Sequence, residues 1–279
     1  MSNKKIVLFF AITFGWAWLF WLPYTLPTFG VENLPEWLTT FKMPIQVLGA
    51  SAPLASALIL IGSAEGWQGI KKFFKKVLDF RIKPIYIVIA LLLSSVSNII
   101  AHYYPNIMGL EELPNSYFPF EAGLPIFLTV FIYIFVMFLI GGGQEEFGWR
   151  GYILEPLQEK LGVIKASLLI GIIWGLWHYP LWLMPGESHI YYSFISFVIF
   201  ATTFSLIIGI MYNVSGKKFV IAWIMHAASN FFLSLFPVFF TKDVAQPSYM
   251  VWIAINIVTA IGLTIWYQTR KNKQVMQTQ

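Results

Sequence analysis

The sequence contains no cysteine and few charged residues. Without thiols the chain can form no disulfide, bind no metal through thiolates and use no cysteine nucleophile. Charged residues make up 11% of the chain and hydrophobic residues 58%, whereas a typical soluble domain is about 25% charged. A large apolar surface must therefore face something other than water, and no polar stretch is long enough to form a separate soluble domain.

The sequence contains long apolar runs. A helix needs about 20 apolar residues to cross a bilayer, and none of these runs shows the alternation of an outer-membrane barrel strand. The first run is too long for a signal peptide and lacks a small-residue cleavage site, so we expect it to be retained. The sequence predicts an all-α, polytopic transmembrane helical bundle, with residues 1–279 as a single integral membrane domain. The eight predicted spans are roughly 6–26, 43–63, 84–102, 125–148, 163–184, 190–213, 219–238 and 248–268.

Basic residues mark one side of the membrane. Lys and Arg are in excess in cytoplasmic loops. Of the 18 in this chain, only Lys42 and Lys242 lie in the loops after odd-numbered spans, and Arg150 lies within an apolar stretch. The others fall at the termini and in the alternate loops, so both termini are predicted to be cytoplasmic. The net charge of +5 therefore reflects topology, and we expect the lipid bilayer, not a nucleic acid, as a partner.

Residues 64–83 carry lysines among apolar residues at roughly helical spacing. Such a stretch is typical of an amphipathic helix that lies on the anionic inner leaflet. A basic loop that only sets the topology explains it equally well, and the sequence does not separate the two interpretations.

Three polar motifs interrupt the apolar runs, and ionisable groups inside spans tend to face a cavity or mark function. The first is Glu145-Glu146-x-x-x-Arg150, which follows three glycines. Glu146 and Arg150 are four residues apart, so they share a helix face and can pair, and Glu145 then points about 100° away. Because the apolar character continues past Arg150, we expect the helix to run to about Glu155, with Glu145 about 15 Å inside its end. The alternative is that these charges only mark the membrane edge.

The other two motifs are Trp174-x-x-x-His178 in the fifth run and His226-x-x-x-Asn230 in the seventh. A lone buried histidine is usually structural, and a His–Asn pair on one helix face can simply hold helices together. Counted from the nearest basic residues, however, both histidines lie roughly 12–20 Å inward, close to the depth of the first motif. The three motifs are therefore predicted to form one site, towards the cytoplasmic half of the membrane.

Together, the side chains of the three motifs carry the groups that can hydrolyse a peptide bond. A carboxylate can take a proton from water while an imidazole holds that water or protonates the leaving group. An amide and a second imidazole can donate hydrogen bonds to an oxyanion. A zinc centre is the alternative, with Glu145, His178 and His226 as candidate ligands, although H-E-x-x-H is absent. The residues alone do not choose between water held by zinc and water held by side chains.

In order and spacing, the three motifs resemble the CAAX prenyl endopeptidase family, also called the CPBP or Abi family of intramembrane proteases. That family carries E-E-x-x-x-R, F-x-x-x-H and H-x-x-x-N on successive membrane helices, and the resemblance covers about residues 125–235. One departure is Trp174, where the family usually has Phe. The resemblance implies an endopeptidase of metallo- or glutamate type that acts on a membrane-anchored or lipidated peptide or protein, including prenylated CAAX-type substrates.

The same resemblance implies a role for each motif residue. Glu145 and His178 would activate the attacking water, and His226 and Asn230 would stabilise the oxyanion. The supporting residues would be Glu146, Arg150 and Trp174. Zinc is the candidate cofactor.

Two other functions remain open. Intramembrane Glu and His residues also form proton relays in transporters, although the two halves of this chain show no repeat. A non-catalytic scaffold or bacteriocin-immunity protein of the same fold would need no turnover. The composition indicates a bacterial inner membrane, and we expect the site to open towards the cytoplasm. The two remaining histidines, His102 and His189, lie at outer ends or loops and receive no role.

Overall fold

The computed structural model describes residues 1–31, 33–109 and 113–277, with side chains as far as residue 273. The described residues form helices joined by turns and loops, without a strand, so the predicted all-α class is confirmed. Within these described ranges, six helices are long and apolar enough to cross a membrane, or seven if one bent pair counts as a single span.

The first half of the chain supplies three of the predicted spans. Helix α1 (Asn3–Trp21) continues into the 3-10 helix η1 (Leu22–Phe29). After the short α2 (Glu36–Thr40), helices α3 (Lys42–Ala50) and α4 (Ala52–Val77) form the bent pair, with 52° between them. Helix α5 (Pro84–Ile107) follows.

The second half supplies the rest. Its elements are α6 (Ile126–Leu139), the 3-10 turn η2 (Gly143–Glu145), the π-helix η3 (Phe147–Ile153), α7 (Leu154–Trp177), the 3-10 turns η4 (Tyr179–Leu183) and η5 (Ser188–Tyr191), α8 (Phe194–Val214), α9 (Phe219–Leu235) and α10 (Pro247–Gln277).

Helix α9 lies where the seventh span was predicted but is shorter than expected. It has 17 residues, and at 1.5 Å per residue it measures about 26 Å, less than the roughly 30 Å hydrocarbon core. The count of eight spans is therefore reached only if α9 is included.

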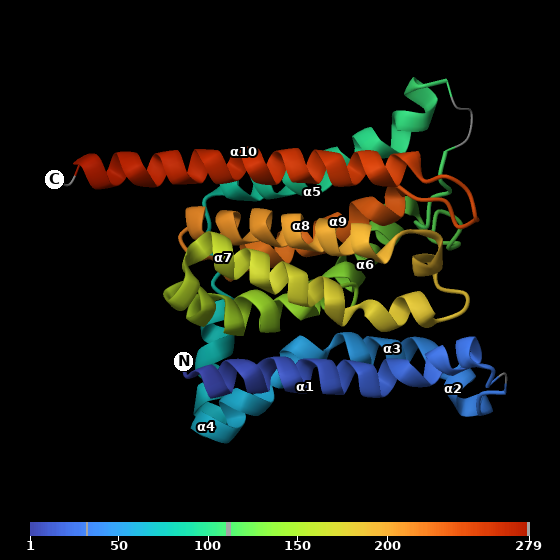
Figure 1. Ribbon diagram of the computed structural model, residues 1–279, viewed down its shortest axis with the longest axis horizontal. Coiled ribbons are helices and arrows are strands. Elements are labelled where there is room, and N and C mark those ends of the chain that lie inside the picture. Colours follow the sequence, from blue (N-terminus) through green and yellow to red (C-terminus); the bar gives the residue numbers. More distant parts are fainter. Residues whose placement is uncertain (32, 110–112, 278–279) are drawn as a thin grey trace.

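Both chain ends lie at one end of the bundle. Figure 1 shows the start of α1 and the last turns of α10 on the same side, as an even number of crossings requires. Ion pairs at this end join lysines to acidic residues. Lys218 binds Asp79 at 2.6 Å, and both Lys76 and Lys217 bind Glu155. That this end is cytoplasmic stays a prediction.

The basic stretch 64–83 is helical only in part. Helix α4 kinks at Gly66 (φ 61°, ψ −159°) and ends at Val77. Beyond the kink, Phe73 and Val77 are buried against Phe147, while the lysines of this segment are exposed. The segment is thus amphipathic, with its apolar face on the protein; its contact with lipid stays a prediction.

Tryptophan side chains join the helices that carry the site. Trp18 donates a hydrogen bond from Nε1 to the carbonyl of Trp177 at 3.0 Å, and Trp177 donates to the carbonyl of Thr13 at 3.3 Å. On the other side of the bundle, Trp252 donates to Asn98 at 2.7 Å. Since unpaired polar groups are costly inside a membrane, each indole satisfies its own N–H while holding two helices at a fixed distance.

Candidate functional site

The segment that carries both glutamates is not the continuous helix that the sequence predicts. Helix α6 ends at Leu139, and the chain turns through Gly142 at φ 99°, a left-handed conformation that glycine adopts without strain. The chain then forms η2, which ends at Glu145, and the π-helix η3, which leads into α7. The expectation of an unbroken helix to about Glu155 is wrong because three successive glycines disfavour helix. π-Helical turns are rare and frequently found at functional sites.

The carboxylate of Glu146 contacts the side chains of both Arg150 and His226. Its Oε1 accepts from Nη1 of Arg150 at 2.7 Å and lies 2.8 Å from Nδ1 of His226. The side chains of Glu146 and Arg150 are fully buried, and that of His226 is 3% exposed. The predicted Glu146–Arg150 pair is confirmed. The contact with His226, from a helix 80 residues further along the chain, could not be read from the sequence.

Glu145 points to a different partner. Its Oε2 accepts a hydrogen bond from Nε1 of Trp174 at 2.8 Å, and the residue is buried. A phenylalanine at position 174 would have no N–H to donate. The departure from the family pattern therefore adds a polar contact to the aromatic wall, and it fixes one of the two carboxylate oxygens.

His178 lies at the end of a helix, not deep within one. Helix α7 ends at Trp177, and His178 is its C-cap residue. Nδ1 of His178 is 2.7 Å from the carbonyl oxygen of Trp174. A carbonyl oxygen can only accept, so Nδ1 carries the proton, and Nε2 of the neutral ring is an acceptor. The ring packs edge-on against Trp177 and Phe197, which holds it in place.

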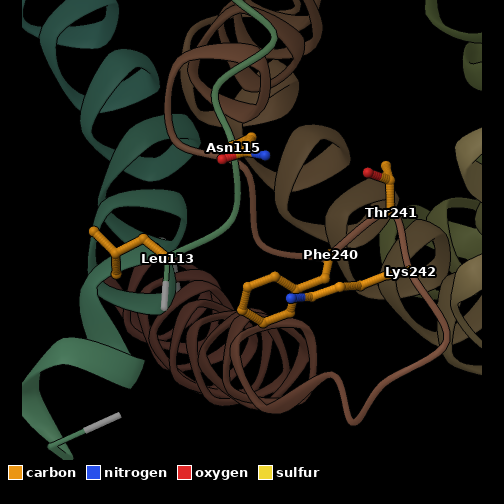
Figure 2. Close-up of a pocket in the computed structure, with 5 residues that line it drawn as sticks. All are labelled: Leu113, Asn115, Phe240, Thr241 and Lys242. Carbon is orange, nitrogen blue, oxygen red and sulfur yellow. The ribbon is translucent and has the colours of Figure 1, made fainter. Parts of the chain in front are cut away.

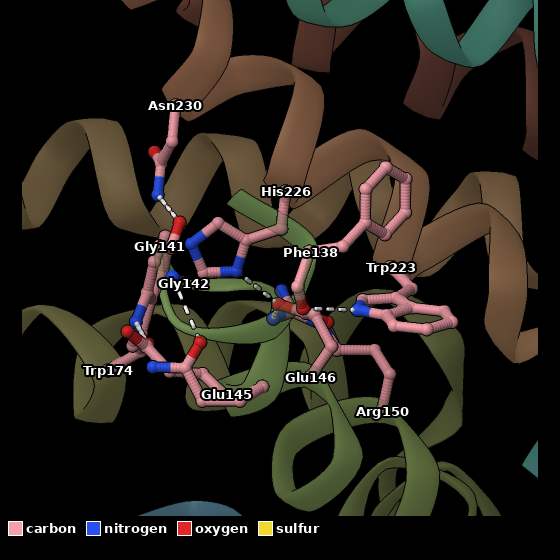
Figure 3. Close-up of polar contacts among 11 residues, drawn as sticks. Phe138, Gly141, Gly142, Glu145, Glu146, Arg150, Trp174, Trp223, His226 and Asn230 are labelled. Atoms are coloured by element: carbon pink, nitrogen blue, oxygen red, sulfur yellow. Dashed lines mark hydrogen bonds and ion pairs between the residues drawn. The ribbon is translucent and has the colours of Figure 1, made fainter. Parts of the chain in front are cut away.

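The glycine turn covers His226 and Asn230 (Figure 3). Nδ2 of Asn230 donates to the carbonyl oxygen of Gly141 at 2.7 Å. A Cβ at position 142 would lie 2.4 Å from Nδ2 of Asn230 and 2.6 Å from Nε2 of His226. Only a glycine fits there, and the two groups predicted to stabilise an oxyanion lie side by side beneath it.

The four predicted catalytic residues meet at one cavity. Glu145, His178, His226 and Asn230 all line a space of about 200 Å³, which Trp174 also lines. Aromatic side chains of α8 and α10 form much of its remaining wall. A second cavity of about 230 Å³ lies towards α1 and α3. Both cavities are lined by Glu145, His178, Leu181 and His189, so these four residues form the boundary between them. His189 had no predicted role.

The cavities lie towards the end of the bundle that is opposite the chain termini. The second is lined by Gln46 of α3 and by Glu187 and His189 of the loop before α8, which Figure 1 places at the far end from the start of α1. On the termini side of the glutamates, a buried cluster that includes Phe147 and Phe219 fills the space. The cytoplasmic termini and the opening of the site towards the cytoplasm both stay predictions.

A third cavity lies away from these residues. It has a volume of about 220 Å³ and is lined by the residues drawn in Figure 2, in the loops after α5 and α9. Because it contains neither a carboxylate nor an imidazole, it is not a candidate for the hydrolytic site.

The predicted zinc ligands do not fit a metal ion as they lie. In the ranges that the structure describes, no three His, Asp or Glu side chains are grouped to hold one. Nδ1 of His226 and Nδ1 of His178 each have another partner, and one oxygen of Glu145 is held by an indole. Zinc as the cofactor stays a prediction.

Comparisons with known proteins identify the region that carries the three motifs. Residues 125–232 match the family model of the type II CAAX prenyl endopeptidases, described as Rce1-like. Over 233 residues the chain is 27% identical to CAAX prenyl protease 2 of Methanococcus maripaludis, a match that covers 80% of this chain and 82% of that protein. The resemblance drawn from the motifs is confirmed. The match supports an intramembrane endopeptidase and, with the apolar helices, an integral membrane protein.

We expect Arg150→Met to destabilise the protein by about 3–5 kcal/mol, because it leaves the buried Glu146 carboxylate without its arginine. The matched control is Arg81→Met. Arg81 contacts Asp79 at the same 2.7 Å, but its side chain is 89% exposed, so its loss should change stability little. Thermal unfolding in detergent measures both. Equal unfolding temperatures for the two variants would show that the buried pair is not a structural requirement.

Proposed function

Because residues 125–232 match the Rce1-like CAAX prenyl endopeptidase family model, we propose that this chain is an intramembrane endopeptidase that hydrolyses a peptide bond of a membrane-anchored substrate. The observation that carries the proposal is the convergence of Glu145, His178, His226 and Asn230 on one cavity within the helical bundle. Residues far apart in the sequence meet there, and each brings a polar group that peptide hydrolysis needs.

Glu145 and His178 are suited to activate water. With Oε2 of Glu145 held by Trp174, the other carboxylate oxygen is left to accept a proton. Nε2 of His178 is an acceptor as well, since its Nδ1 proton goes to a backbone carbonyl. A water molecule between these two acceptors would donate one hydrogen to each, with its lone pair free to attack the peptide carbonyl. Glu145 then passes the proton to the leaving amine.

His226 and Asn230 are suited to stabilise the oxyanion. Asn230 uses one amide hydrogen for Gly141 and keeps a second. His226 donates from Nδ1 to Glu146, so it can donate from Nε2 as well only as an imidazolium. The buried Glu146 carboxylate accepts from both Arg150 and His226. The ion pair thus holds the His226 ring in place beneath the glycine turn.

The substrate class follows from the walls of the cavity. Phe197, Phe200 and Trp252 line it, and such apolar walls suit a substrate with a lipid or an apolar side chain. A prenylated C-terminus, of the kind that the name of the archaeal relative indicates, is one such substrate, and a peptide anchored by its own apolar segment is another. A bacterial inner membrane stays the predicted location.

We expect Glu145→Gln to reduce peptide cleavage by at least about 100-fold, because the amide cannot take a proton from water. The control is Glu159→Gln, which alters an exposed glutamate of α7 and should leave cleavage unchanged. The measurement is cleavage of a membrane-anchored peptide by the purified protein in detergent. Full cleavage by the Glu145 variant would exclude the mechanism, and a biological effect that survives its loss would favour the scaffold.

Trp174→Phe offers a finer test, because it keeps the aromatic ring and removes only the indole N–H. A hydrogen bond to a charged group contributes about 1.5–3 kcal/mol, so we expect kcat to fall about 10-fold or more with unchanged KM. Circular dichroism and thermal unfolding serve as controls for the fold. An unchanged kcat would mean that the orientation of Glu145 does not depend on the indole.

A further inference from the structure

The direction in which the cavities open limits where a substrate can come from. The cavity next to α3 is lined by Gln46, Glu187 and His189, at the end of the bundle away from the termini. Towards the termini, Phe73, Phe147 and Phe219 are buried in one apolar cluster. Among the described residues, both cavities that reach Glu145 are thus lined by residues of the far end of the bundle, and an apolar cluster lies on the other side of the glutamates.

Charge distribution assigns that end to one side of the membrane. Of the 18 basic residues, the described structure places only Lys42 and Lys242 at the cavity end, and Arg150 is buried at the site. Lys42 is neutralised there by Glu187 at 2.8 Å. The remaining basic residues lie at the termini and in the loops beside them. Since basic loops stay in the cytoplasm, the open end faces away from it.

Resting on the proposed function, we infer that the site takes its substrate from the extracytoplasmic face of the membrane, through the opening between α3 and the loop 184–193. The substrate class is then a peptide that has been exported or is anchored in the membrane with its cleaved segment outside. A protein whose lipidated terminus remains in the cytoplasm would meet the side that the aromatic cluster fills.

The absence of cysteine makes this inference directly testable, because any introduced cysteine is unique. Ser188→Cys places a thiol between Glu187 and His189, and Glu36→Cys places one on exposed α2 at the same end. Glu159→Cys places a thiol at the basic end. In intact cells, a membrane-impermeant maleimide should label positions 188 and 36, whereas position 159 should react only after permeabilisation.

The reverse pattern, with position 159 labelled in intact cells and positions 36 and 188 protected, would overturn the inference. Position 36 decides the outcome if position 188 is shielded by its neighbours. Labelling does not depend on catalysis. A protein that shows the expected pattern but cleaves no peptide would retain the inferred orientation and lose the proposed function, so the two failures are distinguishable.

A second inference comes from His189 itself. The residue lines both cavities, together with Glu145 and His178. Its Nδ1 is buried and has no hydrogen-bond partner among the described residues, although buried polar groups are nearly always paired. Trp182 and Tyr192 pack against the ring and hold it in place. An oriented imidazole with an unpaired nitrogen, at the boundary where the two cavities meet, points to a ligand.

The chemistry of the ring identifies what it binds. Burial lowers the pKa of His189 to about 4, so the ring is neutral at physiological pH. A neutral imidazole offers one donor and one acceptor, as a peptide group does. We propose that His189 binds a backbone peptide group of the substrate next to the scissile bond. It would position the chain across Glu145 without taking part in proton transfer.

We expect His189→Ala to raise KM by about 10-fold with little change in kcat, as expected when binding alone is lost. His189→Asn keeps a donor near the place of Nδ1 and His189→Gln near the place of Nε2, so one of them should restore KM. The control is His102→Ala. The Nδ1 of the buried His102 is already paired with the Pro237 carbonyl at 2.8 Å, so the loss of this side chain should lower thermal stability and leave KM unchanged.

A purely structural role for His189 would give a different result. In that case His189→Ala would lower the unfolding temperature as His102→Ala does, KM would not move, and neither amide variant would differ from alanine. That outcome would overturn the proposal while leaving the activity assigned to Glu145 intact.

Discussion

The burial of two adjacent carboxylates in an apolar bundle is the constraint that organises this structure. An isolated charge is costly in such surroundings, and the two glutamates are stabilised by different partners. Glu146 accepts from Arg150 and contacts His226, whereas Glu145 accepts from the indole of Trp174. These partners come from η3, α7 and α9, so the helices must pack closely enough to bring them together. The carboxylate without an arginine partner is the one proposed for the chemistry.

Much of the architecture could be predicted from the sequence because membrane helices have a simple signature. Every predicted span coincides with a helix or a bent pair of helices, and the local pair Glu146–Arg150 follows from its spacing alone. The breaks were harder to predict. The turn at Gly142 and the end of α7 at Trp177 depend on which backbone fits between packed helices, and α9 proved shorter than a full span.

The site was only partly readable for a related reason. Motif residues could be selected because polar groups are rare in apolar runs, but their partners belong to distant segments. The bond from Trp174 to Glu145 joins residues 29 apart, and that from His226 to Glu146 joins residues 80 apart. His189 was passed over because its position in a loop gave no hint that the loop folds back over the cavity. The side on which the site opens stays a prediction, because depth along a helix does not say which end of a site is open.

The contact between Gly141 and Asn230 has a consequence for how the Asn230 amide is oriented. In this structure a backbone carbonyl of the protein already occupies one hydrogen of the Asn230 amide. Because an amide group is planar, fixing the direction of one of its two N–H bonds also fixes the other. In the proposed mechanism, the second hydrogen would therefore be oriented before any substrate binds, and the side chain would lose no rotational freedom at that step. The glycine turn would thus preorganise the group on which it rests.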